Sequence, residues 1–298
     1  MKRKLIQLSP STAVISLPSK WLKRNGLVKG VEIDIEEVED KLIVSSEKFS
    51  EQKEVLIDIS KMPTSLIWGV TDAAYIAGYD SIKLHFQDSK HSEILNKVVR
   101  FMPGFMIFDE RKNSIVLKDM SVNPDTDIDK VLQRIFHLIK TLIVDSIEAI
   151  EQKDYDTLAL MKKRDYNINM YMSYCLRQLN KFGYCKYSKT SLVHTYIKTL
   201  EMMADKLTTL FVGIGIEKLK ITKEELKAIS DINLMYSDLK KIHNKFEYDS
   251  VIDLDKKRNY LGPKICKFGK NQNHVMIYLT EILESFHDLI ELEMQLNV

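Results

Sequence analysis

The sequence predicts a multidomain protein with a β-rich unit at 1–48, a small α+β domain at 52–120 and an all-α bundle at 125–298. Three patterns support this division. Short strand-like stretches separated by turn residues come first, strand and helix patterns then alternate, and helical periodicity fills the rest of the chain. At 298 residues, 45% of them hydrophobic and 29% charged, the chain is long enough for two or three domains with their own cores.

The N-terminal unit contains two predicted strand pairs and one short helix. A strand, a turn at "SPST" and the strand "AVISLP" come first, and "SKWLKRNG" then predicts a helix that ends at Asn25–Gly26. The alternating stretch "VKGVEIDIEEVEDKLIVSSE" predicts a hairpin that turns at Glu39–Asp40. A unit of about 46 residues is too small to bury a stable core alone, so we expect it to dimerise.

The charge of this unit is strongly uneven. Residues 1–31 contain seven basic residues and no acid, whereas residues 32–40 contain six acids, although the net charge of the whole chain is only +2. A local positive field of this kind is typical of a phosphate-binding surface, but it is also found on a basic edge that only keeps a protein soluble. The charge pattern alone does not distinguish a phosphate-binding surface from a basic edge that only keeps the protein soluble.

The segment "LSPSTAVISLPSKWLKRNGLVKGVEIDIE", followed by "KLIVSS", resembles the AbrB/MazE/SpoVT family of swapped-hairpin DNA-binding domains. The resemblance implies an all-β domain that dimerises by interleaving hairpins and presents basic residues to DNA phosphates. The second strand departs from the usual "ItIP" pattern, since it reads "AVISLP". The matching basic positions are Arg3, Lys4, Lys20, Lys23 and Arg24.

The middle segment predicts a sheet with helices on one face. Its expected elements are a strand at "EVLIDIS", a helix at "SLIWGVTDAAYIAGY", a strand at "SIKLHFQ", a helix at "SKHSEILNKVVRFM" and a hairpin at "GFMIFDERKNSIVLKD" that turns near Lys112–Asn113. Asp72 and His85 are interpreted as isolated structural residues. The segment could be a spacer, a dimer contact or a sensor.

The remaining residues predict six helices with short connections, which is typical of an antiparallel bundle. The expected helices span about 127–151, 154–182, 189–216, 222–247, 250–268 and 272–297. Gly213 and Gly215 are expected to form a helix-end turn.

An internal repeat divides the bundle into halves at about 125–216 and 222–298. The third helix of the first half carries Glu201 and Asp205, and the third helix of the second half carries Glu284 and Asp288 at the same spacing, 83 residues later. Carboxylates four residues apart share one helix face and repel each other slightly. Both a solvated surface and a site that binds cations remain open for these pairs.

This arrangement resembles the PhoU family, whose members have two tandem three-helix repeats, each with a "gD...l......D...N" helix followed by an "ER.aD" helix. The matching stretches of the first half are "KDYDTLALMKKRDYNIN" and "LEMMAD". The resemblance implies a metal cluster, with iron or zinc as the cofactor. Its ligands would be Asp165, Asn169, Glu201 and Asp205 in the first half, and Asp255, Asn259, Glu284 and Asp288 in the second.

Some positions depart from the PhoU pattern. Met202 and Ser285 stand where the family has arginine, and Lys206 and Leu289 stand where it usually has histidine. The second half can also be aligned so that Asn259 and Pro263 match the Asp and Asn of the first half. That alternative alignment would weaken the second site.

Together the two resemblances indicate an archaeal phosphate uptake regulator. They imply DNA binding through the N-terminal unit, and contact between the bundle and a phosphate transporter's ATPase subunit or another signalling protein. One alternative is an AbrB-type transcription regulator whose bundle only oligomerises, and a weaker one is a carboxylate-bridged metalloenzyme. The sequence contains no GxxxxGK[ST], GxSxG or HExxH motif, so we expect no enzyme activity.

The expected location is the cytoplasm. The three cysteines show no CxxC spacing, and the stretch after "MKRK" is too polar for a secretory signal. No apolar run approaches the roughly 18 residues that would insert into a membrane.

Overall fold

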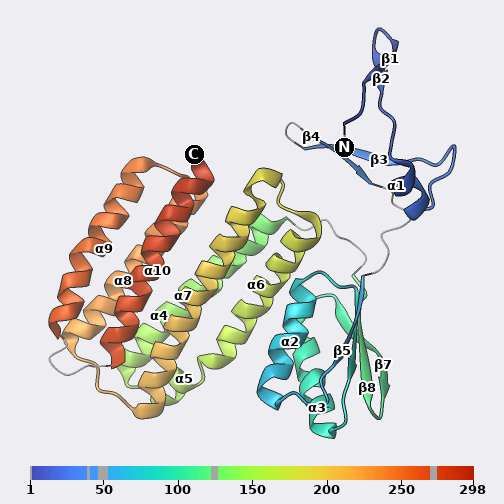
Figure 1. Ribbon diagram of the computed structural model, residues 1–298. Helices are drawn as coiled ribbons and strands as arrows, with labels where there is room; N and C mark the ends of the chain where they lie inside the picture. Colours follow the sequence, from blue (N-terminus) through green and yellow to red (C-terminus); the bar gives the residue numbers. More distant parts are fainter. Residues whose placement is uncertain (1, 39–40, 46–52, 122–126, 269–273) are drawn as a thin grey trace. The chain divides into compact units, whose positions relative to one another are not determined.

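The computed structural model describes residues 2–38, 41–45, 53–121, 127–268 and 274–298. The chain divides into two compact units, Met1–Lys53 and Glu54–Val298, which we call unit 1 and unit 2. The protein is mostly helical, with small sheets near the N-terminus and in the middle of the chain (Figure 1). The expected mixture of β, α+β and helical segments is therefore observed in that order.

Unit 1 contains two separate two-stranded antiparallel sheets. Strands β1 (Ile6–Ser9) and β2 (Thr12–Val14) form the first, and β3 (Asp34–Val38) and β4 (Lys41–Ser45) form the second. Helix α1 (Ser19–Arg24) lies between them in the sequence and ends at Asn25, as expected. The predicted turn at Glu39–Asp40 lies outside the described residues.

The first part of unit 2 is a four-stranded sheet in the order β5-β6-β8-β7, with two helices on one face (Figure 1). The strands β5 and β6 are parallel and the other pairs are antiparallel. Every element predicted for this segment is present, including the hairpin that turns at Lys112–Asn113. The elements are β5 (Glu54–Asp58), α2 (Thr64–Ile76), β6 (Ser81–His85), α3 (Ser89–Val98), β7 (Phe105–Arg111) and β8 (Ser114–Asp119).

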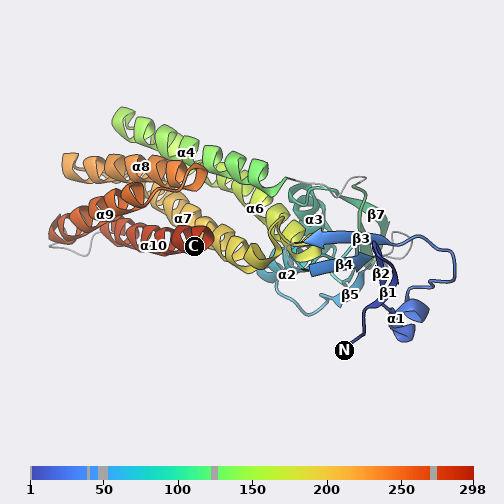
Figure 2. The ribbon, with the colours of Figure 1, turned by 90° about the horizontal axis from the view of Figure 1, so that it is seen from above.

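The second part of unit 2 is helical. Its elements are α4 (Ile128–Gln152), α5 (Tyr155–Ala159), α6 (Lys162–Phe182), α7 (Thr190–Glu217), α8 (Lys223–Asn244), α9 (Tyr248–Phe268) and α10 (His274–Asn297). Helix α7 packs along α10, and α4 packs along α8, so the two halves bury their apolar faces against each other in one shared core. Figure 2 shows α4, α7, α8 and α10 running beside one another.

One helix prediction was wrong in detail. The stretch 154–182 forms two helices, since α5 ends at Ala159, packs closely against α7 and is followed by α6 from Lys162. Gly215 of α7 permits this approach, since a Cβ atom there would lie 2.4 Å from the backbone nitrogen of Ala159. The expected helix-end turn at Gly213 and Gly215 was wrong, because both lie inside α7, which continues to Glu217.

Arg177 of α6 joins the sheet and its helices to the bundle. Its side chain is 1% exposed, and its guanidinium donates hydrogen bonds of 2.8 Å to the carbonyl oxygens of Tyr75 and Tyr79 and pairs with Asp119 at 2.7 Å. Asn180 of α6 donates to the carbonyl of Ile76. Because the last carbonyls of a helix lack some of their partners within it, α6 supplies additional donors to the end of α2 and to the residues just after it. We call Arg177 and these partners the Arg177 clamp.

No helix among the described residues is both long and apolar enough to cross a membrane.

Candidate functional site

The five basic residues that the sequence predicts to contact DNA are all exposed in unit 1. Arg3 and Lys4 precede β1, whereas Lys20, Lys23 and Arg24 lie on α1, the last two in its final turn. Among the described residues none of these five forms an ion pair. Their charges are therefore available to an external anion such as a DNA phosphate.

Unit 1 has no core among the residues whose side chains are described. None of them is buried, and apolar side chains of both hairpins face outward, including Leu5 (69% exposed), Leu8 (67%) and Leu42 (63%). Val28, between α1 and β3, is 72% exposed. An isolated two-stranded hairpin is marginally stable in water, so two hairpins without a buried residue need an additional surface to pack against.

The first predicted carboxylate site lies where α6 packs against α7. The carboxylate of Asp165 is fully buried, and it accepts hydrogen bonds from Lys162 Nζ (2.7 Å) and Asn169 Nδ2 (3.3 Å) on α6 and from Thr208 Oγ1 (3.2 Å) on α7. An ammonium group is thus the counter-ion of this buried charge. A buried carboxylate needs such a partner, because desolvation of an unpaired charge is costly.

The other carboxylates of the first half surround this pair. Partial burial and the nearby Asp165 raise the pKa of Asp205, although Lys162 opposes the shift. Glu201 forms an ion pair with Lys198, one turn away on α7. Asp165, Asn169 and Asp205 therefore lie near one another, and lysine side chains pair with two of the four positions, Asp165 and Glu201.

Asp72 of α2 also belongs to this cluster, so its interpretation as an isolated residue was wrong. It accepts a hydrogen bond from Ser173 of α6 (3.3 Å), and burial raises the pKa of its carboxyl, with a further contribution from Glu201. No sequence pattern links Asp72 to residues about 100 positions away. Only the packing of α2 on α6 brings them together.

The second predicted site is more open. On α9, Asn259 Nδ2 donates to Asp255 Oδ2 (2.8 Å), and Arg258 donates to Asp255 Oδ1. This i to i+4 amide–carboxylate pair repeats the pair formed by Asn169 and Asp165, which favours the alignment of Asp255 and Asn259 with them. Glu284 and Asp288 of α10 are exposed, and neither forms a hydrogen bond or ion pair within the described part of the chain.

These donors do not fit the iron or zinc that the resemblance implies. In the described ranges no three carboxylate, histidine or cysteine side chains lie close enough to hold one metal ion. Lys162 and Lys198 supply positive charge at Asp165 and Glu201, where a metal would have to do so. Metal binding remains a sequence-based prediction that this geometry does not support.

Substitution of Asp205 by asparagine tests the two interpretations directly. With lysines as the counter-ions, the Asp205→Asn protein should be as stable as the wild type or more stable by less than about 1 kcal/mol at neutral pH, because a partly buried like charge is removed. Since the folded-state pKa of Asp205 is raised, any gain should disappear as the pH falls through that pKa. Urea unfolding at several pH values measures this.

The exposed Asp253 of α9 provides the control, and Asp253→Asn should leave stability unchanged. Metal content by plasma mass spectrometry completes the test. Stoichiometric iron or zinc in the wild type that is lost in Asp205→Asn, together with lower stability, would contradict the lysine interpretation.

Comparison of the chain with protein-family models, curated proteins and solved structures gives no match.

Proposed function

We propose that this protein is a homodimeric regulator that binds DNA through unit 1 and receives its signal through the helices of unit 2. The observation that carries this proposal comes from unit 1, where five exposed cations form no ion pair with any described residue and no described side chain of the apolar hairpins is buried. A second copy would bury the apolar side chains, and dimerisation would place two sets of basic residues on one DNA duplex.

The proposed process is phosphate uptake, on the basis of the resemblance to PhoU proteins in the repeated helices. The partner would be a phosphate transporter's ATPase subunit or another signalling protein in the cytoplasm. The Arg177 clamp supports a route for the signal, since a partner that moves α6 also acts on α2 and its sheet. A partner changes DNA binding only if it binds one arrangement of the dimer more tightly than another.

The test is the salt dependence of DNA binding, measured by fluorescence anisotropy on a mixed-sequence duplex. The double variant Lys20→Ala/Lys23→Ala removes four positive charges from a dimer. The slope of log K against log salt should therefore become shallower by up to about 3–4, because each phosphate contact contributes about 0.9. Light scattering on the same samples should give the mass of a dimer.

The matched control removes two exposed lysines of unit 2, Lys220 and Lys227. The double variant Lys220→Ala/Lys227→Ala has the same net charge as the test variant and should keep the wild-type slope. If both double variants change the slope equally, or neither changes it, α1 is not the DNA-binding surface.

A further inference from the structure

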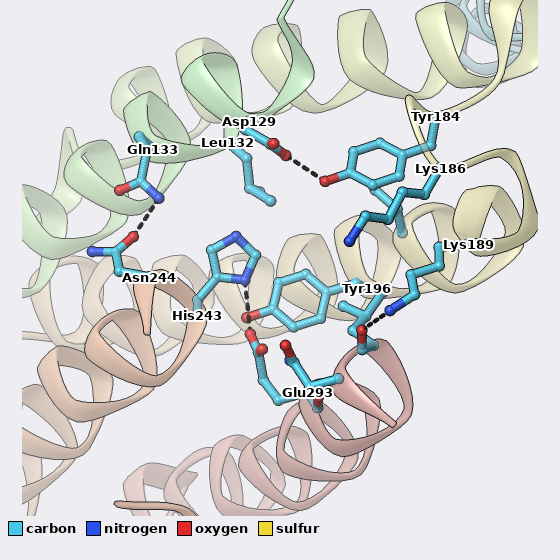
Figure 3. A pocket seen from close by; sticks show the side chains of 13 residues that line it. Asp129, Leu132, Gln133, Tyr184, Lys186, Lys189, Tyr196, His243, Asn244 and Glu293 are labelled. Carbon is cyan, nitrogen blue, oxygen red and sulfur yellow. Dashed lines mark hydrogen bonds and ion pairs between the residues drawn. The ribbon is translucent and has the colours of Figure 1, made fainter. Parts of the chain in front are cut away.

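A polar pocket of about 340 Å³ lies among α4, α7, α8, α10 and the segment between α6 and α7 (Figure 3). Its lining residues differ from the acidic positions of the two repeats, although Tyr196 shares α7 with Glu201 and Glu293 shares α10 with Asp288. Its volume is within the range of small-molecule sites. Both halves of the bundle contribute walls, since Tyr196 comes from the first half and His243 and Glu293 come from the second.

The inner end of the pocket contains a buried acid. Glu293 of α10 is 1% exposed, and its Oε1 lies 2.8 Å from Nδ1 of His243, with which it forms a hydrogen bond. The imidazole of His243 in turn stacks on the ring of Tyr196, with 5.2 Å between ring centroids. This arrangement fixes the carboxylate at the inner wall, where it can accept a hydrogen bond from a ligand.

The hydroxyl of Tyr196 belongs to the same polar end of the pocket as Glu293. The residue is fully buried, and within the described residues its hydroxyl has no hydrogen-bond partner. Figure 3 shows this hydroxyl directed toward the Glu293–His243 pair. Burial raises the pKa of Tyr196, and the neighbouring Glu293 carboxylate raises it further, so the hydroxyl stays protonated beside the acid and both oxygens can face a ligand cation.

The opposite end of the pocket is cationic. Lys186 is exposed and forms no ion pair within the described ranges, and Figure 3 shows its ammonium group directed into the pocket. Lys189 donates to the carbonyl of Leu296. The acid at this end, Asp129, accepts a hydrogen bond from the Tyr184 hydroxyl at 2.8 Å. An anionic group of a ligand would therefore meet at least one ammonium group without a protein counter-ion.

We propose that this pocket binds a small zwitterion, with its ammonium group at Glu293 and Tyr196 and its phosphate or carboxylate group at Lys186 and Lys189. Because the acceptor Glu293 and the cation Lys186 lie at opposite ends of the pocket, the pocket selects a molecule that carries a positive charge at one end and a negative charge at the other. This inference goes beyond the proposed function, because it requires neither DNA nor a protein partner.

Isothermal titration calorimetry on the full chain tests the proposal with four probes. O-phosphoethanolamine and γ-aminobutyrate each carry an ammonium group and an anion, whereas inorganic phosphate and ethanolamine each carry only one of the two. At least one zwitterion should bind saturably, and at least about tenfold more tightly than either single-charge probe, because both ends are engaged. The two zwitterions distinguish a phosphate from a carboxylate ligand. If both fail to bind, or if inorganic phosphate binds equally well, the proposal is wrong.

Variants show whether binding occurs in this pocket. Lys186→Ala and Glu293→Gln should each weaken binding of the zwitterion about tenfold or more, whereas Lys220→Ala, an exposed lysine elsewhere in unit 2, should bind normally. Tyr196→Phe separates ligand binding from folding. It should weaken binding about fivefold and change the melting temperature only slightly, because the ring remains buried and the hydroxyl makes no hydrogen bond of good geometry in the described part of the chain. Unchanged affinity in Tyr196→Phe and Lys186→Ala would overturn the assignment.

Discussion

Replacing Arg177 by methionine is expected to lower the free energy of unfolding of unit 2 by about 3 kcal/mol, because three buried charge-assisted hydrogen bonds are lost and Asp119 keeps only the more distant Lys181 as a counter-ion. Methionine retains much of the apolar stem but none of the donors. Asp119 would lose its 2.7 Å partner and keep only Ser121 and the more distant Lys181, at 3.7 Å. The carbonyl oxygen of Tyr79 would lose its guanidinium donor, and that of Tyr75 would keep only the backbone N–H of Gly78. Each buried acceptor left without a donor adds to the loss.

Urea unfolding followed by circular dichroism measures this effect, and Arg134→Met is the matched control. Arg134 is exposed on α4 and forms no ion pair or hydrogen bond within the described residues, so its loss should change stability by less than about 0.5 kcal/mol. If the two substitutions lower the free energy of unfolding equally, the Arg177 clamp does not stabilise unit 2.

The pH dependence provides a second measure of the clamp. Burial by itself would raise the pKa of Asp119, but hydrogen bonds from Ser121 and Arg177 lower it below its usual value. A lowered folded-state pKa stabilises the protein above the unfolded-state pKa of about 3.9, and this contribution is lost as the pH falls through the folded-state value. The difference between wild type and Arg177→Met should therefore narrow in acid.

Gly215→Ala is expected to destabilise the bundle by about 3 kcal/mol, since the new methyl group has no space. Its Cβ would lie 2.4 Å from the backbone nitrogen of Ala159 and 2.7 Å from the carbonyl oxygen of Tyr155. Both obstacles are backbone atoms of α5, so no side-chain rotation relieves the contact. The short helix α5 would have to move away from α7.

Gly213→Ala, two residues earlier on the same helix, is the control for this prediction. A Cβ at Gly213 meets nothing within 4 Å, so alanine should stabilise α7 by up to about 1 kcal/mol through its higher helix propensity. Thermal unfolding of both variants should therefore shift in opposite directions. A melting temperature for Gly215→Ala at or above that of the wild type would contradict the close packing of α5 on α7.

Local patterns predicted most of the secondary structure but not the carboxylate chemistry. Helix periodicity, Pro18 before α1 and the alternating strands of 54–119 depend on neighbouring residues, and the corresponding elements are observed. The equal spacing in Glu201–Asp205 and Glu284–Asp288 suggested equivalent sites. The two pairs differ in the structure, since Glu201 and Asp205 are partly buried beside lysines whereas Glu284 and Asp288 face outward.

The sequence by itself determined where the helices and strands form, because hydrophobic periodicity, caps and turns act over a few residues. The sequence also determined that the N-terminal unit is strongly basic and too small to bury a stable core alone. Only the tertiary structure decided the break between α5 and α6, the place of Asp72 beside Glu201, the Arg177 clamp and the pocket around Tyr196, His243 and Glu293. These features join residues about 50 to 130 positions apart through helix packing, and no local pattern records such contacts.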